Sequence, residues 1–220
     1  MADKRRVFVT GGTGYMGSRV IPELLRRGHR VRALVRPGSE AKLPEECERV
    51  AGNALDAKSF AGLVAPADTL LHLIGVAHPS PTRAAEFRSV DLASASASAK
   101  AASAAGISHF VYVSVAQPAP VMKAYVEARA EGEAAIRATG ISATFLRPWY
   151  VLGPGHRWPY LVLPIYRLLQ ILPPTRDTAV RLYPVTLAQM IAALVHAVEN
   201  PASGIRIVEA SEVRNVRLEA

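Results

Sequence analysis

The sequence contains very little cysteine: Cys47 is the only one among 220 residues, beside 15 glycines and 16 prolines. A lone thiol excludes a disulfide scaffold and is compatible with a reducing compartment. Glycine and proline near their background frequencies exclude a collagen-like or low-complexity chain. The six histidines have no metal-ligand spacing with one another or with Cys47, so the sequence predicts no metal site.

No apolar run is long enough to cross a membrane. The most apolar stretch, Trp158 to Leu172, is shorter than the roughly 20 residues that a spanning helix requires, and Pro159, Pro164 and Arg167 interrupt it. The first residues, Met-Ala-Asp-Lys-Arg-Arg, lead directly into an apolar strand without the apolar region of a secretion signal. We therefore expect a cytoplasmic protein with no transmembrane segment.

Acidic residues are outnumbered, 18 against 26 Lys and Arg, which gives a formal net charge of +8. An excess of this size raises the question of an anionic partner. The densest basic run, Lys4-Arg5-Arg6, merely precedes a strand, and the other arginines are scattered along the chain. We expect no nucleic-acid partner, and instead a basic solvated surface or a site for an anionic cofactor.

Apolar β-branched runs alternate with helical patterns along most of the chain. This alternation is typical of βαβ units in an α/β fold with a doubly wound parallel sheet, which we expect as a single domain over residues 1–220. The expected strands are Arg6–Thr10, Arg30–Val35, Glu48–Ala51, Thr69–Gly75, His109–Val115, Ala143–Arg147 and Ile205–Glu209. The expected helices are Tyr15–Arg27, Asp56–Leu63, Thr82–Ala105, Val121–Ala138 and Thr186–Glu199.

Two segments depart from plain alternation. Residues 153–184 are rich in proline, aromatic residues and leucine and contain no clear strand, so we expect a small cap on the sheet towards the C-terminus. The Ala/Ser tract from Ala93 to Ala105 is predicted to be a helix with a small-residue face, because alanine is the best helix former and a poor strand former. That face can pack against the sheet or against a second subunit in a homodimer.

The most informative motif runs from Val7 to Gly17, where an apolar strand, a glycine-rich turn and a helix start follow one another directly. Gly11, Gly14 and Gly17 let the backbone turn sharply, approach a pyrophosphate and seat the helix on the sheet. Because the motif opens the first βα unit, it predicts a dinucleotide-binding loop rather than a structural turn alone.

With this loop the chain resembles the short-chain dehydrogenase/reductase superfamily, in its extended and atypical branches, which include NmrA-like and epimerase/dehydratase-like proteins. Further matches follow in the family's order: Gly52 to Asp56 resembles its adenine-contact turn, His72 to Gly75 the end of its fourth strand, Phe110 to Ser114 its fifth strand, and Leu146 to Gly155 its Arg-Pro to Gly-Pro-Gly stretch. The resemblance implies a Rossmann-like fold and an NAD(P) cofactor. It assigns cofactor contacts to Gly11, Thr13, Gly14, Tyr15, Met16, Gly17, Asn53, Ala54, Ile74, Gly75 and Pro148.

Arg36 follows the second strand, at the place that faces the adenosine ribose in this architecture. An acidic side chain there accepts from the ribose of NAD, whereas an arginine favours the 2′-phosphate of NADP. We therefore expect NADP, with NAD as the alternative, and Ser39 and Lys42 as further phosphate donors. Arg36 could also be simply a solvated strand-end arginine. Asn53 stands where the family usually has Asp, and it can still accept from the adenine amino group.

The family's Tyr-x-x-x-Lys helix is matched by Tyr125 to Arg129, so the lysine position holds arginine. In the family the tyrosine is the acid/base, the lysine contacts the nicotinamide ribose and a serine steadies the substrate carbonyl. The resemblance thus assigns catalytic roles to Tyr125, Arg129 and Ser114, although Val115 could equally occupy the serine position. A guanidinium is a wider planar fork than an ammonium. Either Arg129 acts in altered geometry or the reductase function is lost, and Tyr125 is either catalytic or a core tyrosine.

Two functions of different class follow. The first is an NADP(H)-dependent oxidoreductase that moves hydride between nicotinamide and a small, apolar carbonyl or quinone-like substrate under the cap. The second is a non-catalytic dinucleotide-binding sensor or assembly factor of the NmrA-like kind. Trp158 to Leu172 carries more apolar surface than one helix face can bury, which calls for a substrate cleft, a second subunit or a membrane surface. We expect a substrate lid, with Trp149, Tyr150 and Trp158 lining the pocket and Arg167 in solvent.

Overall fold

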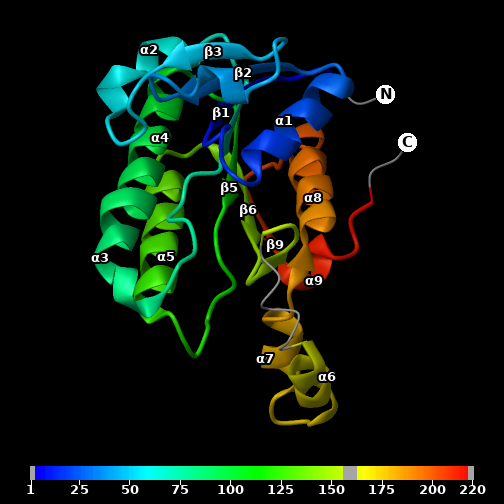
Figure 1. The fold of residues 1–220 in the computed structure, drawn as a ribbon. Helices are drawn as coiled ribbons and strands as arrows, with labels where there is room; N and C mark the ends of the chain where they lie inside the picture. The colour runs from blue at the N-terminus through cyan, green and yellow to red at the C-terminus, as the bar shows by residue number, and fades with distance from the viewer. Residues whose placement is uncertain (1–2, 156–162, 218–220) are drawn as a thin grey trace.

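The computed structural model describes residues 3–155 and 163–217, which are built around a seven-stranded parallel sheet (Figure 1). The strands lie in the order β3-β2-β1-β4-β5-β6-β9, and each neighbouring pair is parallel. Their bounds are β1 (Arg6–Thr10), β2 (Arg30–Val35), β3 (Glu48–Ala51), β4 (Thr69–His72), β5 (His109–Val113), β6 (Ser142–Arg147) and β9 (Ile205–Glu209). The order reverses between β1 and β4, as in a Rossmann sheet, so the predicted doubly wound α/β fold is confirmed.

Helices cover both faces of the sheet (Figure 1). One face packs against α1 (Gly17–Arg26), α8 (Leu187–Glu199) and α9 (Ala210–Val213), and the other against α2 (Ala61–Val64), α4 (Ala93–Ala104) and α5 (Lys123–Arg137). Consecutive strand residues point to opposite faces, so Leu70 and Leu71 of β4 lie in different apolar cores. Short connecting helices are η1 (Glu40–Lys42), η2 (Ala57–Ser59), η3 (Pro81–Arg83) and α3 (Ala84–Glu86).

Two central strands are shorter than predicted. The sequence predicts that β4 reaches Gly75 and β5 reaches Val115, but these strands end at His72 and Val113. Pairing of β4 with β1 stops at the pair of Thr10 with His72, because β1 turns there into the glycine-rich loop. The residues after each strand are therefore loops at the carboxyl edge of the sheet, where ligands of this fold bind.

The single helix predicted over Thr82–Ala105 is divided into η3, α3, a π-helical turn η4 (Phe87–Leu92) and α4. The helix predicted over Asp56–Leu63 is likewise divided, into η2 and α2. Phe87 and Asp91, both in the π-helical turn, are buried in the interior. Single π-helical turns frequently occur at functional sites.

The small-residue face of α4 packs on the sheet, as one of the two alternatives predicted. Its alanines lie in an apolar core, and its serines Ser94 and Ser98 approach a buried histidine of β4, His72. The Nδ1 atom of His72 lies 3.0 Å from Ser98 Oγ and 2.7 Å from the Oγ1 atom of Thr10. Burial lowers the pKa of His72 to about 3, and the positive charge of Arg129 acts in the same direction.

This environment predicts that the protein loses stability in mild acid. Because the pKa of His72 is about 3 in the fold and 6.5 when free, the unfolded chain binds a proton between these values that the folded chain excludes. The free energy of unfolding therefore falls as the pH drops below 6.5. Burial lowers the pKa of His109 to about 4, which adds to the effect. We expect the urea midpoint to fall from neutral pH to about pH 4.5, and to fall less in His72→Asn. The same pH dependence in both proteins would contradict this assignment.

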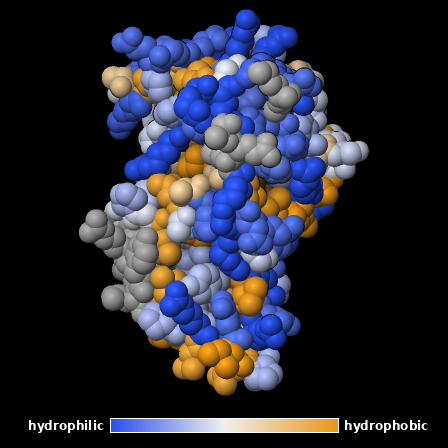
Figure 2. Space-filling view, turned by 90° about the vertical axis from the view of Figure 1, so that its right-hand side faces the viewer, coloured by the Kyte–Doolittle hydropathy of each residue, from blue (hydrophilic) through white to orange (hydrophobic). Residues whose placement is uncertain are grey.

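The segment expected to form the cap is flanked by two short strands, β7 (Val151–Leu152) and β8 (Val185–Thr186), which pair in parallel. In the described part of this segment, α6 (Leu163–Ile171) and α7 (Arg176–Arg181) pack on each other and project from the sheet (Figure 1). Figure 2 shows apolar residues gathered at the far tip of this projection. None of the helices in residues 3–155 and 163–217 combines the length and apolarity of a membrane span.

Candidate functional site

In the glycine-rich loop, Gly17 and Gly14 differ in how much room each leaves for a side chain. At Gly17 an added Cβ would lie 2.3 Å from the carbonyl oxygen of Gly11, so the fold itself requires glycine there. At Gly14 the nearest atom to an added Cβ is the same oxygen at 3.2 Å, and the residue is exposed. An added Cβ at Gly14 would thus be in close contact with this oxygen but far less crowded than one at Gly17.

Helix α1 begins directly after this loop. No side chain caps it at Met16, and its first turn contains no acidic residue. The N–H groups of Ser18 and Arg19 donate to the carbonyl oxygens of Gly14 and Met16. The positive end of the helix dipole favours an anion at this place. The loop is thus compatible with a pyrophosphate, and the contacts assigned to Gly11, Thr13, Gly14 and Met16 stay predictions.

Arg19 is a cationic residue at this loop that the sequence did not single out. Its guanidinium lies over the ring of Tyr15, 4.7 Å from the centroid, and donates to the carbonyl oxygen of Tyr15 at 2.7 Å. Tyr15 in turn packs against the base of the cap, because a Cβ on Gly153 would lie 2.2 Å from its hydroxyl oxygen. Arg19 follows Gly17 by two residues and belongs to no motif, so only the fold reveals its place.

Arg36 begins a tight turn directly after β2. The N–H of Ser39 donates to the carbonyl oxygen of Arg36 at 3.0 Å, and Gly38 takes a positive φ of 83°. The side chains of Arg36 and Lys42 are exposed and that of Ser39 is half-buried. Because β2 lies beside β1, this turn is adjacent to the strand that leads into the glycine-rich loop. The assignment of Arg36 to a 2′-phosphate stays a prediction that this placement permits.

Asn53 and Ala54 form a turn after β3 that is fixed by local hydrogen bonds. The Oδ1 atom of Asn53 accepts from the N–H of Leu55 at 3.1 Å, and the hydroxyl of Ser59 accepts from the N–H of Asn53 at 3.0 Å. The amide oxygen predicted to contact adenine therefore already has one partner, although a carbonyl oxygen can accept two hydrogen bonds. Asn53 is exposed and Ala54 half-buried.

Arg129 is held in a buried ion pair beneath the loop that follows β4. Its Nη2 atom lies 2.7 Å from Oδ1 of Asp91, and the two side chains are 5% and 0% exposed. Its Nη1 atom donates to the carbonyl oxygen of Val113 at 2.8 Å. The other carboxylate oxygen of Asp91 accepts from the N–H of Val76 at 3.1 Å. At Gly75 an added Cβ would lie 2.1 Å from Arg129 Nη2, so the predicted cofactor loop Ile74–Gly75 rests directly on the guanidinium.

Tyr125 lies one turn before Arg129 on α5 and is half-buried. Its ring centroid is 5.0 Å from that of Phe87, and the Arg129 guanidinium carbon lies 5.4 Å from it. The π-helical turn η4 thus supplies both neighbours of this pair: Phe87 contacts Tyr125, and Asp91 contacts Arg129. The fold brings Tyr125 and Arg129 together as the sequence predicted, and their catalytic roles stay predictions.

Ser114 lies at the carboxyl end of β5, but its hydroxyl is taken up by a carboxylate. Ser114 Oγ donates to Oε1 of Glu133 at 2.6 Å, and Ser114 is 2% exposed. Glu133 also accepts from Gln117 and, through both oxygens, from Arg147 of β6 at 2.9 and 2.7 Å.

Val115, the alternative for the serine position, is equally buried. Pro148 follows Arg147 and is buried, and its carbonyl oxygen accepts from the N–H of Ala116.

Aromatic side chains gather where the cap meets the end of β6. Trp149 and Tyr150 have ring centroids 5.6 Å apart, and Tyr166 of α6 and Tyr183 have theirs 6.1 Å apart. Burial raises the pKa of Tyr150 and of Tyr166. The apolar pocket expected to be lined by Trp149 and Tyr150 stays a prediction, and Trp158 lies outside the described residues.

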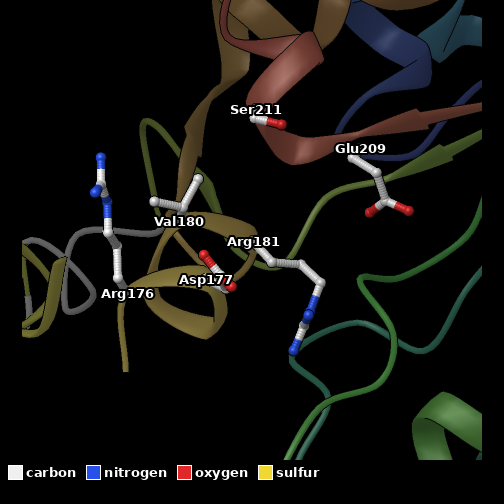
Figure 3. Close-up of a pocket in the computed structure, with 6 residues that line it drawn as sticks. All are labelled: Arg176, Asp177, Val180, Arg181, Glu209 and Ser211. Atoms are coloured by element: carbon white, nitrogen blue, oxygen red, sulfur yellow. The ribbon is translucent and has the colours of Figure 1, made fainter. Parts of the chain in front are cut away.

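A cleft of about 480 Å³ opens between α7 and the segment that joins β9 to α9 (Figure 3). Its lining residues are Arg176, Asp177, Val180, Arg181, Glu209 and Ser211. Glu209 also pairs with Arg147 at 3.3 Å, which connects the cleft to the buried Glu133 cluster. The cleft is charged, unlike the apolar pocket expected from the sequence. No set of three metal-ligating side chains occurs among residues 3–155 and 163–217.

Comparison with known proteins gives a consistent result. Residues 11–157 match the model of a family described as NAD(P)H-binding. A ceramide reductase of Caulobacter vibrioides is 30% identical over 210 residues, which are 94% of this chain and 65% of the relative. A 3-beta-hydroxysteroid dehydrogenase of Mycolicibacterium neoaurum is 32% identical over 116 residues, 50% of this chain and 32% of the relative. The chain thus spans just under two thirds of the first relative and about a third of the second.

Solved structures share the fold at low sequence identity. The enzyme WbmH of Bordetella bronchiseptica, in complex with NAD+, has a TM-score of 0.68 and 19% identity, over 94% of this chain and 75% of that one. A dTDP-glucose 4,6-dehydratase double mutant from Streptomyces venezuelae, with NAD bound, also has a TM-score of 0.68 and 19% identity, over 92% of this chain and 74% of that one.

Proposed function

Because the chain belongs to the NAD(P)H-binding family, among the atypical short-chain dehydrogenase/reductases, we propose that it is an NADP(H)-dependent oxidoreductase acting on the carbonyl of an apolar, lipid-like substrate. The observation that carries the proposal is the glycine-rich loop at the start of α1. Gly14 is exposed there, and no side chain caps the helix. Arg36, Ser39 and Lys42 on the neighbouring turn favour NADP over NAD through their donors and positive charge.

The substrate class is proposed from two independent supports. Aromatic rings of Trp149, Tyr150, Tyr166 and Tyr183 surround the junction of cap and sheet, which suits an apolar ligand. The two relatives described above are named for a ceramide and for a 3-beta-hydroxysteroid, and both of these are lipids. A lipid ketone or its alcohol is therefore the first substrate class to test.

The roles of this chain's residues follow from their placement. NADPH, when bound, supplies the hydride to the substrate carbon. Tyr125 would donate a proton to the carbonyl oxygen, since it occupies the acid/base position of the family and is half-buried at the start of α5. Arg129 would hold its positive charge against the ring of Tyr125 and beneath Gly75, because Asp91 fixes the guanidinium there. Ser114 would act with Glu133, its hydrogen-bond partner, to order the end of β5.

The preference for NADPH over NADH can be tested at Arg36. We expect NADPH to bind more tightly than NADH, and Arg36→Ala to weaken NADPH binding by roughly 10- to 100-fold with little change for NADH, because a hydrogen bond to a charged group contributes about 1.5–3 kcal/mol. Calorimetric titration of both cofactors measures this. Arg30→Ala, at the opposite end of β2 and also exposed, is the matched control and should leave both affinities unchanged. Equal affinities for the two cofactors in the parent protein would rule out the role of Arg36.

A second candidate function, a dinucleotide-binding sensor without turnover, is favoured by one observation. Besides Tyr125, the residues assigned to catalysis are Arg129 and Ser114. Arg129 forms an ion pair with Asp91, and the hydroxyl of Ser114 donates to Glu133. In a binding protein without turnover, these two side chains would stabilise the fold and would not act on a substrate.

Turnover separates the two candidates. NADPH oxidation is followed with long-chain keto-lipids and 3-ketosteroids, using Gly14→Val as the variant without cofactor, since a branched side chain there would stand where the pyrophosphate must approach. The melting temperature of this variant is compared with that of the parent to show that it is folded. Oxidation that depends on the lipid ketone and is absent in Gly14→Val supports the reductase. NADPH binding without oxidation of any substrate in the panel assigns the protein to the sensor class.

A further inference from the structure

The outer side of α6 carries the largest group of exposed apolar side chains in the described residues. Ile165, Leu168, Ile171 and Leu172 are 56%, 60%, 76% and 45% exposed, and we call these four residues the outward face of α6. Figure 2 shows the corresponding apolar surface at the tip of the projection, remote from the sheet. Contiguous exposed apolar surface of this kind marks an interaction site.

Helix geometry places this face away from the body in the described residues. At 3.6 residues per turn, Ile165, Leu168 and Ile171 fall on one side of α6, Leu168 lies nearly opposite Tyr166, and Leu172 directly follows the helix. Tyr166 packs against Tyr183, with ring centroids 6.1 Å apart, so it anchors α6 to the body. The inner side of α6 therefore packs on the body, and its outward face has no apolar partner among residues 3–155 and 163–217.

The charges around this face are mostly positive. Arg167 and Arg176 are exposed, and neither pairs with a carboxylate of the described residues. Residues 156–184 contain four arginines and a single acidic residue, Asp177, while the chain as a whole has a net charge of +8. An apolar helix face flanked by arginines complements a surface with an apolar interior and a negatively charged rim.

We propose that the outward face of α6 docks on the surface of an anionic lipid bilayer, with the cap arginines on the phosphate groups of the lipids. A second copy of the chain is the less suitable partner, because an α6-to-α6 contact would bring Arg167 of each copy, and two chains of charge +8, together. The docking surface rests on α6 alone. Its use, delivery of an apolar substrate from the bilayer to the cap, rests on the proposed function.

The test measures vesicle binding by the full chain without any turnover. The parent protein should sediment with vesicles of phosphatidylcholine and phosphatidylglycerol, and less with phosphatidylcholine alone or at high salt. Leu168→Glu combined with Ile171→Glu should weaken this binding by about 10-fold or more, because it places two charges in the inserting face. Arg167→Glu should weaken binding to the anionic vesicles and have little effect on the small binding to phosphatidylcholine.

Leu55→Glu is the matched control, since Leu55 is also an exposed leucine (46%) but follows β3 at the opposite end of the molecule from the cap. It should bind vesicles as the parent does, and all variants should keep the parent melting temperature. Absence of parent binding, or equal binding by the α6 variants, overturns the proposal. So does a parent dimer on sizing that the α6 variant dissociates, because a second copy then covers this face. Lipid-ketone turnover is scored separately, so a failed reductase assay leaves a positive vesicle result intact.

Discussion

Asp91→Ala is expected to destabilise the protein by about 3–5 kcal/mol, because it leaves the Arg129 guanidinium buried without its counter-ion. The pair is enclosed on all sides, with exposed fractions of 5% and 0%, and the lost carboxylate also leaves the N–H of Val76 without its acceptor. Asp91→Asn should be milder, since the amide oxygen can still accept from Val76. Urea unfolding followed by circular dichroism measures these differences.

A second ion pair in the chain serves as a control, because it has the same N–O distance as the pair of Asp91 with Arg129 but is exposed. Arg88 and Glu131 form an ion pair with the same N–O distance, 2.7 Å, but with exposed fractions of 62% and 45%. Glu131→Ala should therefore change stability little, because water and side-chain entropy offset the attraction of an exposed pair. The double replacement of Asp91 by Leu and Arg129 by Met should recover much of the loss of Asp91→Ala. If Asp91→Ala destabilises no more than Glu131→Ala does, the buried pair has no special role in the fold.

Tyr125→Phe is expected to lower the rate of carbonyl reduction by about 10²–10⁴ while leaving NADPH affinity within about twofold, if Tyr125 is the proton donor. The phenyl ring keeps the contacts with Phe87 and with the Arg129 guanidinium, so the variant should also keep its melting temperature. Single-turnover rates at saturating NADPH separate the chemical step from binding.

The opposite result is equally informative. A rate that is unchanged in Tyr125→Phe would assign the proton to water or another group and leave Tyr125 as a packing residue against Phe87.

Arg129→Lys tests the second residue assigned to catalysis. A lysine restores the family's usual side chain but cannot reproduce both contacts of the guanidinium, with Asp91 and with the carbonyl oxygen of Val113. We therefore expect this variant to lose stability even if its turnover is retained.

Local signals in the sequence were sufficient for the sheet and for the glycine-rich loop. Gly17 and Gly14 stand at fixed spacing in one strand-turn-helix unit, so their roles depend on neighbours within a few residues. The ion pair of Asp91 with Arg129 and the contact of Ser114 with Glu133 were not predictable in this way. Their partners lie 38 and 19 positions apart, respectively, and come together only when separate elements pack.

The cap illustrates a different limit. Apolar periodicity over α6 indicates that the helix has apolar sides but not which of them meets the body. The sequence predicts an apolar excess on this segment, and the fold shows that Tyr166 packs inward while Leu168 is exposed. Strands of two residues, such as β7 and β8, are too short for any alternation to be recognised.

The pairing of β7 with β8 has a consequence for how proteins of this kind can diversify. Val151 pairs with Val185 and Leu152 with Thr186, so the chain departs for the cap and returns from it at adjacent points. Parallel strands cannot be joined by a tight turn and need a crossover of about a dozen or more residues, so any connection longer than that can join β7 to β8. Residues 153–184 are thus exchangeable as a module: a different cap could be grafted at the same two ends, altering substrate choice while the dinucleotide-binding half keeps its sequence and its folding.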